Sequence, residues 1–410
     1  MISTVCQGRM DQESSRSPAI RKRRVVYIPG YDLRRPETVL SQLREELARF
    51  CALRSVEGGF SDARPGSGES SLDWTGRVAW PEGTVTTDFS LLGWRDLGRR
   101  DFQRPLWAVI AGALRTLTLF ARAGGYSERL RANWMNGLFF LYPMVAILVF
   151  LILSVVPTLL LPFILPGTGP LHAVLSVASG LAWMALLYWT TRFVERWTYV
   201  WYLIHDWYSI GRLARDEDPQ MTARIIEFAD RIIQIARRCE PDEELVLVAH
   251  SSGTFVLLYT LEVVLKRRPD FGSTQGKVTV LTMGSAFAYV GGFGAHRGFG
   301  ATVASLAQAK HLDWTDVYAP HDVLCCGRTE PVATYAPHLA PHVREPRRFS
   351  VKVPDRMSAE RYRHLRFRFF KLHFCYFLAS ERADLFDFYR LTLGPLPAAR
   401  QLCHWARSLP

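Results

Sequence analysis

The sequence predicts an α/β fold with a mostly parallel sheet, interrupted by an inserted two-helix transmembrane hairpin. Two observations lead to this class. Short apolar, β-branched runs end in turns and are followed by segments whose leucines and isoleucines recur with helical spacing, a pattern typical of parallel strands joined by helices. Between two groups of such runs lies a long segment without Asp, Glu, Lys or Arg.

The first strand is expected at Val25–Ile28, and Gly30 ends it. A helix over residues 36–50 follows, with leucines at core-facing spacing. A strand that breaks at a glycine before a helix presents a free backbone N–H, here on Tyr31, which is a candidate donor to an oxyanion. The alternative is an ordinary turn that ends the strand.

An apolar strand at residues 245–248 runs directly into Ala-His-Ser-Ser-Gly, and a helical pattern follows. This context suits a nucleophile elbow, a turn so tight that the residues two before and two after the serine must be small. Ala249 and Gly253 meet that requirement around Ser251. The sequence therefore predicts Ser251 as a nucleophile and the Ser252 N–H as an oxyanion donor. The alternative is a serine that only caps a helix.

Two candidate acids follow the elbow. Buried strands are expected at residues 277–283 and 314–318. Asp322 comes a few residues after the second of these strands, in a proline-containing turn, where a carboxylate can turn back toward the edge of the sheet. Asp316 lies inside the strand and is the weaker candidate.

A general base is needed because a serine hydroxyl is a poor nucleophile until its proton is removed, and imidazole titrates near working pH. Of the eleven histidines, His373 is preferred because it lies between aromatic residues and follows the candidate serine and acid along the chain. His364, in an arginine-rich segment, is the second candidate. His338 and His342 lie in a proline-rich loop.

The chain resembles the α/β-hydrolase superfamily, in particular its lipase- and esterase-like members. The resemblance rests on short blocks: PGYD at 29–32, AHSSG at 249–253, MGS at 283–285, PHDV at 320–323 and LHFCY at 372–376. It implies a triad of Ser251, Asp322 and His373, with oxyanion amides from Tyr31 and Ser252. In two departures, alanine replaces the usual first glycine of the elbow, and the segment before the first strand is short. The second departure predicts a sheet reduced at its N-terminal edge.

From Ala132 to Thr191 the chain carries no Asp, Glu, Lys or Arg. Two apolar blocks, residues 138–165 and 171–189, fill this stretch and are separated by Pro-Gly-Thr-Gly-Pro. A membrane core ~30 Å thick takes about 20 helical residues, so each block is long enough to cross it. We therefore expect a transmembrane hairpin. A buried helical hairpin in a soluble domain is the alternative.

The turn between the blocks is too short and uncharged to be a domain, so both ends are expected on one side of the membrane. Arg129 and Arg131 before the hairpin, with Arg192 and Arg196 after it, predict that this side is cytoplasmic. Residues 1–20 are polar, and no signal peptide is expected. The protein is expected in a bacterial-type inner membrane, with its catalytic halves joined in the cytoplasm.

The composition of the chain limits which cofactors and binding partners can be expected. Seven cysteines without a CxxC pair predict reduced thiols and no zinc site. No other metal site and no cofactor is expected. The net charge is +12, yet no nucleic-acid-binding motif is found and no nucleic-acid partner is expected. Basic clusters at Arg21–Arg24, Arg99–Arg100 and Arg361–Lys371 are interpreted as contacts with anionic lipid headgroups, with a solvated basic face as the alternative.

Four further segments complete the description. Residues 95–131 are expected to form an amphipathic helix, either a lid along the membrane surface or a plain packing helix. Residues 57–71 are predicted as a mobile loop and residues 291–300 as a flexible glycine-rich loop near the active-site edge. A core helix is expected at residues 219–238, capped by Asp218.

The predicted division is a disordered tail at 1–20, a first hydrolase-like part at 21–131, the hairpin at 132–196, a second part at 197–395 and a C-terminal tail at 396–410. The expected function is hydrolysis of an ester, with a lipid or other hydrophobic acyl ester favoured by the membrane anchor. Thioester, amide and acyl-transfer chemistry remain open. The alternative is a catalytically silent hydrolase-like membrane scaffold or receptor, and a transporter is a poor third.

Overall fold

The computed structural model describes residues 19–132, 134–273, 278–293, 298–327 and 329–407, and the strands within them form one nine-stranded mixed sheet. In chain order the strands are β1 (Lys22–Ile28), β2 (Glu57–Phe60), β3 (Arg64–Pro65), β4 (Leu72–Trp80), β5 (Gly83–Leu91), β6 (Glu244–His250), β7 (Val278–Met283), β8 (Leu312–Tyr318) and β9 (Arg347–Ser350). Their order across the sheet is β2-β4-β5-β1-β6-β7-β8-β9, with β3 paired to β4. From β5 to β9 neighbouring strands are parallel, whereas β4 is antiparallel to β2, β3 and β5. The predicted α/β class with a mostly parallel sheet is confirmed.

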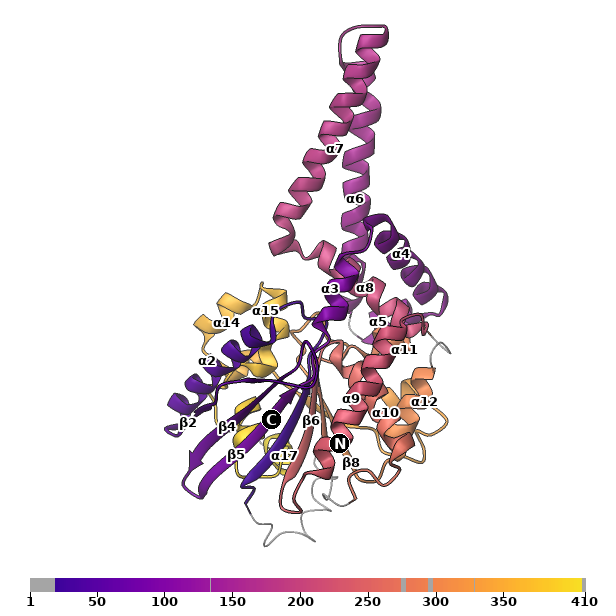
Figure 1. Ribbon diagram of the computed structural model, residues 1–410. Helices are drawn as coiled ribbons and strands as arrows, with labels where there is room; N and C mark the ends of the chain where they lie inside the picture. Colours follow the sequence, from indigo (N-terminus) through magenta and orange to yellow (C-terminus); the bar gives the residue numbers. More distant parts are fainter. Residues whose placement is uncertain (1–18, 133, 274–277, 294–297, 328, 408–410) are drawn as a thin grey trace.

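Helices pack on both faces of this sheet (Figure 1). Before β6 the helices are α2 (Pro36–Arg54), α3 (Arg95–Phe102), α4 (Leu106–Arg122), α5 (Gly125–Ala132), α6 (Trp134–Ile164), α7 (Pro170–Thr198), α8 (Val200–Ala214) and α9 (Pro219–Arg237). After β6 they are α10 (Gly253–Arg267), α11 (Phe287–Gly291), α12 (Phe299–Gln308), α13 (Pro331–Tyr335), η2 (Val353–Arg356), α14 (Ala359–Leu365), α15 (Phe369–His373), η3 (Cys375–Phe377), α16 (Phe388–Leu393) and α17 (Ala398–Arg407). The helix expected at 219–238 is present as α9, and the Asp218 carboxylate caps it by accepting from the Met221 N–H.

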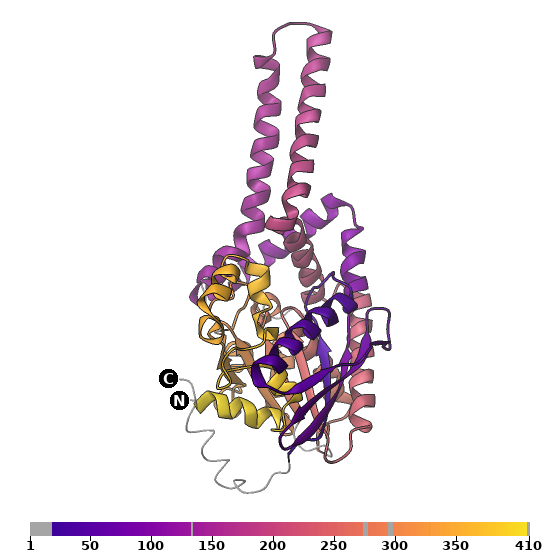
Figure 2. The ribbon, with the colours of Figure 1, turned by 90° about the vertical axis from the view of Figure 1, so that its left-hand side faces the viewer.

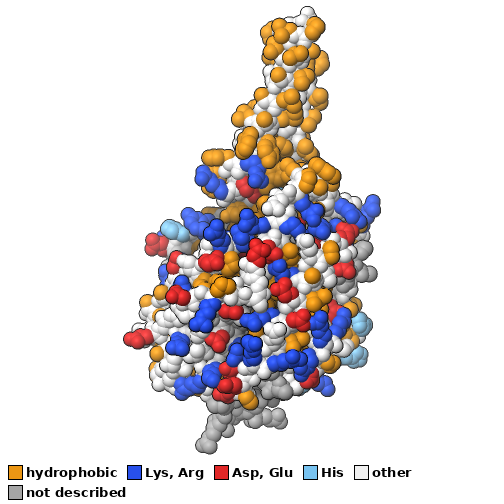
Figure 3. Space-filling view, in the orientation of Figure 1, with side chains coloured by type: hydrophobic (Ala, Val, Ile, Leu, Met, Phe, Trp, Pro, Cys, Tyr) orange, Lys and Arg blue, Asp and Glu red, His pale blue; other side chains and the backbone are white. Residues whose placement is uncertain are grey.

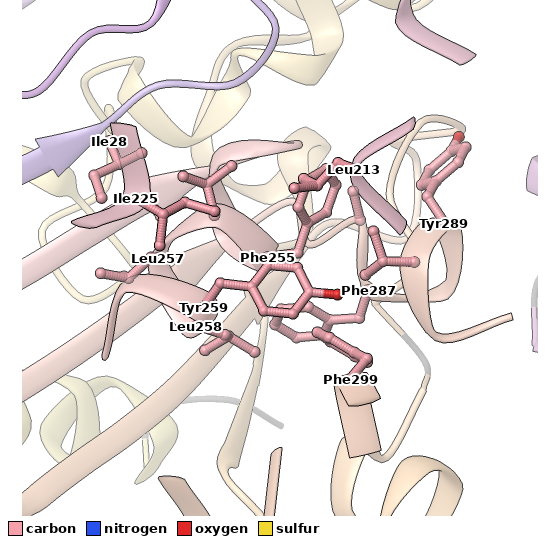
Figure 4. Close-up of a cluster of buried hydrophobic side chains, with 14 of the residues drawn as sticks. Ile28, Leu213, Ile225, Phe255, Leu257, Leu258, Tyr259, Phe287, Tyr289 and Phe299 are labelled. Carbon is pink, nitrogen blue, oxygen red and sulfur yellow. The ribbon is translucent and has the colours of Figure 1, made fainter. Parts of the chain in front are cut away.

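The central strand β6 separates two hydrophobic cores. It is buried along its whole length, and successive side chains point to opposite faces of the sheet. Leu245 and Leu247 join one core with α8, α9, α10 and α12, whereas Val246 and Val248 join the other with α2, α16 and α17. In the first core, side chains of α10 such as Phe255 lie among residues from its neighbouring helices (Figure 4). Burial on both faces is what a continuous apolar run predicts.

The prediction of a sheet reduced at its N-terminal edge is wrong. Residues 57–91 add β2 to β5 beside β1, so the antiparallel edge is built from chain that follows the first helix. The predicted loop at 57–71 contains β2 and β3. The overlooked signal is the period-two alternation of β4, in which Leu72, Trp74 and Val78 are buried and the residues between them, Gly76 excepted, are more exposed.

The single amphipathic helix expected at 95–131 is three helices, α3, α4 and α5. Pro105 separates the first two because a proline cannot continue the hydrogen bonding of the preceding turn. Gly124, with φ of +76°, separates the second and third. Helix α4 packs along α8 and buries Val109 and Phe120, while Trp107 on its other side is 75% exposed.

Helices α6 and α7 lie side by side and project from the body of the molecule (Figures 1 and 2). Both are long and apolar enough to cross a membrane, and only 11% of the most apolar window of each is buried. In Figure 3 apolar side chains cover this projection, whereas charged side chains are spread over the body. The helices approach closely at Gly180, where a Cβ would lie 2.6 Å from Thr158 Cγ2, and the Trp183 indole N–H donates to the Leu153 carbonyl at 2.8 Å.

The predicted segment limits are shifted in several places. The hairpin helices cover 134–198 rather than 132–196, and the side chains of Arg129 and Arg131 lie outside the described part of the structure. Helix α17 occupies the expected C-terminal tail and buries Leu402 and Trp405, so that tail is a packed element. The predicted tail at 1–20 lies outside the described residues except for residues 19 and 20, as do residues 294–297 of the glycine-rich loop.

The basic cluster Arg21–Arg24 does not form an unpaired cationic surface. Arg23 is buried, and its guanidinium lies 2.7 Å from the carboxylate of Glu244, its neighbour across the β1–β6 pair. Arg24 pairs with Glu243 at 2.7 Å. The cluster also lies at the amino end of β1, remote from the hairpin (Figure 1). Lys22 pairs with Glu240, so three of the four charges are paired within the fold, and Arg21 is exposed.

Replacement of Arg23 by alanine is expected to lower the free energy of unfolding by about 3–5 kcal/mol, because it leaves the Glu244 carboxylate buried without its partner. Chemical denaturation of the detergent-solubilised protein measures this loss. The matched control is Lys22→Ala, which removes an exposed pair with Glu240 and should have a far smaller effect. Equal losses in the two variants would contradict the importance of the buried pair.

Candidate active site

Ser251 lies in a sharp turn between β6 and α10. Its φ is +57°, a left-handed backbone conformation that is uncommon for a residue with a side chain. Small neighbours make the turn possible: Ala249 is fully buried, and a Cβ at Gly253 would come within 2.4 Å of the Ile28 carbonyl oxygen. The Ser251 N–H donates to the Met283 carbonyl of β7 at 3.0 Å. A tight strand-to-helix turn with small residues around the serine is the local arrangement that the predicted nucleophile elbow requires.

The loop after β1 lies directly against this serine. A Cβ at Gly30 would fall 2.8 Å from Ser251 Cβ and 3.2 Å from Ser251 Oγ, so this position requires glycine. The Tyr202 hydroxyl of α8 donates to the Tyr31 carbonyl and holds the loop in place. Among the described residues, the N–H groups of Tyr31 and Ser252 donate no hydrogen bond, and both residues line the pocket that contains Ser251. Two backbone donors are therefore available beside the serine.

The structure brings together Asp322 and His373, which are distant in the sequence. His373 ends α15, Asp322 lies in a turn after β8, and both side chains are buried. His373 Nδ1 lies 2.7 Å from Asp322 Oδ2. Because a carboxylate only accepts, Nδ1 carries the proton and Nε2 keeps its lone pair in the neutral ring.

His373 and Ser251 line the same pocket. Within the described residues, His373 Nε2 has no hydrogen-bond partner, so Ser251 Oγ and the imidazole are not hydrogen bonded to each other. Such a bond between a nucleophile and its base often tightens only in the complex with substrate. The imidazole therefore presents a free acceptor nitrogen in the pocket of the serine.

Two further contacts fix the Asp322 carboxylate. Its Oδ1 accepts from the Leu324 N–H at 3.0 Å, and its Oδ2 accepts from the Tyr376 hydroxyl at 3.0 Å. The Tyr376 oxygen in turn accepts from the Ala319 N–H at 3.0 Å. Burial raises the pKa of Tyr376 well above its ordinary value, so the phenol remains a neutral donor. The role of Tyr376, three residues after His373, was not predicted from the sequence.

His250 is a second buried imidazole beside the site, and its role was also missed. Its ring lies 4.5 Å from the His373 ring, and its Nε2 donates to the His373 carbonyl at 2.8 Å. Burial, followed by the neighbouring His373, lowers the pKa of His250 well below its ordinary value. His250 is therefore a neutral donor that positions the backbone of His373. Its place directly before Ser251 was the one available signal.

The other candidate acid and the other candidate histidines do not line the pocket of Ser251. Asp316 is buried in β8, where its two oxygens accept from the hydroxyls of Thr282 and Ser285 at 2.6 and 3.2 Å. Burial raises the pKa of Asp316 to about 7, and within the described part of the chain no hydrogen bond joins it to His373. The other histidine candidates are exposed and do not line the pocket: His338, His342 and His364.

The pocket over Ser251 is narrow, with a cavity volume of about 50 Å³. Its walls are mostly apolar and come from the base of α6, from α8 and from α15 with the residue after it: Phe139, Phe140, Pro143, Leu203, Trp207, Ile210, Phe370 and Phe374. Two carboxylates, Asp32 and Asp206, also line it. An apolar lining with a few polar groups is typical of a small-molecule site.

In the described part of the chain, no group of three or more His, Cys, Asp or Glu side chains is arranged to hold a metal ion. No protein-family model, curated protein or solved structure matches this chain.

The neutral state of His250 predicts a pH dependence of stability. Below about pH 6.5 the unfolded chain binds a proton on this imidazole that the folded protein excludes, so the free energy of unfolding should fall as the pH falls. His250→Asn keeps a side-chain N–H donor but does not titrate. Denaturation curves between roughly pH 4 and 7 should therefore show a shallower pH dependence in this variant. An identical slope in the two proteins would contradict the assignment.

Proposed function

We propose that this chain is a membrane-anchored serine hydrolase of the α/β-hydrolase type, which cleaves the ester bond of a lipid or other hydrophobic acyl ester. One observation carries the proposal: Ser251, in a strained strand-to-helix turn, lines the same pocket as the buried Asp322–His373 pair. The order of serine, aspartate and histidine along the chain agrees with that superfamily, as does their location after three strands of the parallel part of the sheet, β6, β8 and β9.

In the proposed acylation step, Ser251 Oγ attacks the carbonyl carbon of the ester while His373 Nε2 takes the hydroxyl proton. The Tyr31 and Ser252 N–H groups stabilise the negative oxygen of the tetrahedral intermediate. The bond between this carbon and the alcohol oxygen then breaks, and the imidazolium gives its proton to the departing alcohol. Asp322 stabilises the imidazolium while it carries that proton.

The deacylation step repeats this chemistry with water. A water molecule attacks the acyl carbon and transfers a proton to His373 Nε2. The bond between the acyl carbon and Ser251 Oγ breaks, and the same proton returns to the serine. The products are a carboxylic acid and an alcohol, and the free enzyme is restored.

The proposed membrane anchor is the hairpin of α6 and α7. Two adjacent helices of this length, apolar on their outer surfaces, would expose far more contiguous apolar area to water than a soluble monomer usually does. Arg192 and Arg196 are exposed at the end of α7, and the guanidinium of Arg196 lies 3.8 Å from the centroid of the Trp197 ring. Cationic and aromatic side chains at this level suit the membrane interface and favour a cytoplasmic body.

The segment that carries His373 also suits contact with lipid headgroups. Helices α14 and α15 lie on the hairpin side of the body (Figure 1). Arg363, Arg366 and Arg368 are exposed there, and Phe367 is 73% exposed. Exposed arginines around an exposed aromatic ring favour an anionic membrane surface as partner. Of the basic clusters in the sequence, this one supports the lipid interpretation best.

Ser251→Ala is expected to abolish hydrolysis of short acyl esters, with a loss of at least about a thousandfold in rate, because it removes the nucleophile. It should also abolish covalent labelling by a fluorophosphonate probe, which reacts with activated serines. The detergent-solubilised protein is the sample for both measurements.

Ser252→Ala is the matched control, since it removes a neighbouring hydroxyl but retains the backbone N–H. It should keep both labelling and hydrolysis. Retention of more than about a tenth of the wild-type rate by Ser251→Ala would contradict the assignment. A scaffold without catalysis would give no labelling even in the wild-type protein.

The topology makes a separate prediction. Tags at the N-terminus and at the C-terminus should both be accessible only from the cytoplasm, and a tag inserted near Gly167 only from the opposite side. Protease protection in intact and permeabilised cells measures this. Termini on opposite sides would contradict the hairpin, and recovery of the full-length protein in the soluble fraction would favour the buried-hairpin alternative.

A further inference from the structure

Asp206 is a carboxylate in the candidate active pocket that neither the triad nor the oxyanion donors account for. It lies on α8, the helix that follows the hairpin, and it lines the same cavity as Ser251 and His373. Aromatic and aliphatic side chains of α6 and α8 form most of the wall around it. A charged group in such a wall requires an explanation.

The carboxylate has no partner within the described residues. It makes no hydrogen bond or ion pair there, and its Oδ1 is fully buried. The two nearby phenols are directed elsewhere: the Tyr31 hydroxyl donates to the Gly98 carbonyl and the Tyr202 hydroxyl to the Tyr31 carbonyl. Burial raises the pKa of Asp206 to about 7, and no cation among the described side chains opposes this shift.

Asp32, the other carboxylate of this pocket, provides the contrast. Its two oxygens accept from the guanidinium of Arg34, with an Nε to Oδ1 distance of 2.9 Å and an Nη2 to Oδ2 distance of 2.5 Å. Asp32 is therefore satisfied by the protein itself, whereas Asp206 is not. A buried polar group without a partner costs free energy, and a ligand that supplies the missing donor recovers it.

We propose that Asp206 binds a hydrogen-bond donor of the substrate, which is then an ester carrying a hydroxyl or ammonium group close to the scissile bond. The proposal rests on the hydrolase function proposed above and specifies its substrate class. The apolar walls accept the hydrocarbon part, and the single carboxylate accepts the polar part. A purely apolar ester leaves Asp206 unpaired, so the site discriminates against it.

Two pairs of esters of equal size test this inference on the purified full-length protein in detergent. In the first pair 2-hydroxyethyl butyrate is compared with propyl butyrate, and in the second protonated 2-(dimethylamino)ethyl butyrate with 3-methylbutyl butyrate. The wild-type protein should favour the donor-bearing ester in at least one pair by about tenfold or more in kcat/KM. Preference in the first pair identifies a hydroxyl, and preference in the second an ammonium group.

Variants of Asp206 test whether this side chain causes the substrate preference. Asp206→Leu should bring the ratio of kcat/KM values in both ester pairs close to one, because leucine cannot accept a hydrogen bond. Asp206→Asn should reduce mainly the ammonium ratio, because an amide oxygen still accepts from a hydroxyl but carries no charge. Asp270→Asn is the control: it removes one exposed surface carboxylate, paired with Arg268, and should retain the wild-type ratios.

The outcomes separate this inference from the proposed function. Wild-type ratios near one, or a preference that survives Asp206→Leu, would overturn the role of Asp206 while ester hydrolysis still stands. If the wild-type protein hydrolyses none of the esters and is not labelled by a fluorophosphonate, the proposed function fails and this inference with it. The wild-type comparison needs no variant, so poor folding of a mutant leaves the test intact.

Discussion

Parallel pairing of β1 with β6 is the constraint on which the rest of the architecture depends. The two strands lie on opposite sides of the hairpin in the sequence, and they pair from Arg23 with Glu244 to Ile28 with Ala249. Because parallel strands end at the same edge of a sheet, the turns that follow them meet there. The approach of Gly30 to the serine turn is a direct consequence. The chain between β5 and β6 must therefore begin and end at the same sheet. Two antiparallel helices that project from the body return the chain to it, whereas a single projecting helix would leave β6 at the far end.

Local patterns in the sequence were sufficient for β1, β6, β7 and β8 and for the two long apolar helices, whereas β5 and β9, the outer strands of the parallel part, were not predicted. Strands buried on both faces are continuous apolar runs, and β6 and β7 are recognisable for that reason. Residues 57–91 were not recognised, because glycine, serine and threonine dilute an alternation that only antiparallel pairing explains. The break at Pro105 is a local signal that was overlooked, because a proline interrupts helical hydrogen bonding. The packing of α17 through Trp405 was missed because it depends on tertiary contacts more than on helical periodicity.

The candidate site also contains residues that the sequence indicates and residues that it does not. Ser251 and its small neighbours are set by a local turn, so the sequence alone indicates them, and the chain order of Asp322 and His373 narrows the choice of acid and base. His250 and Asp206 could not be assigned a role in this manner. His250 acts on the carbonyl of a residue more than a hundred positions away, and the isolation of Asp206 depends on which side chains of α6 and α8 surround it. Burial also shifts the pKa values of these two groups, and no local pattern records burial of that kind.

The proposed anchor and the proposed pocket share side chains, which limits how a substrate can be admitted. A cavity of about 50 Å³ lies well below the ~300 Å³ at the lower end of ordinary ligand pockets, so some wall residues must move. Helix α15 is a poor choice, because its last residue, His373, is held by Asp322 at 2.7 Å and by His250 at 2.8 Å, and a shift of α15 would break the base away from its acid. Phe139, at the base of α6, is half-buried and takes no part in the Asp322–His373 pair, whereas Phe140 is buried against the rings of Phe120 and Trp207. Rotation of the Phe139 ring can enlarge the cavity while the Asp322–His373 pair stays intact, and it opens the pocket at the point where the hairpin meets the body.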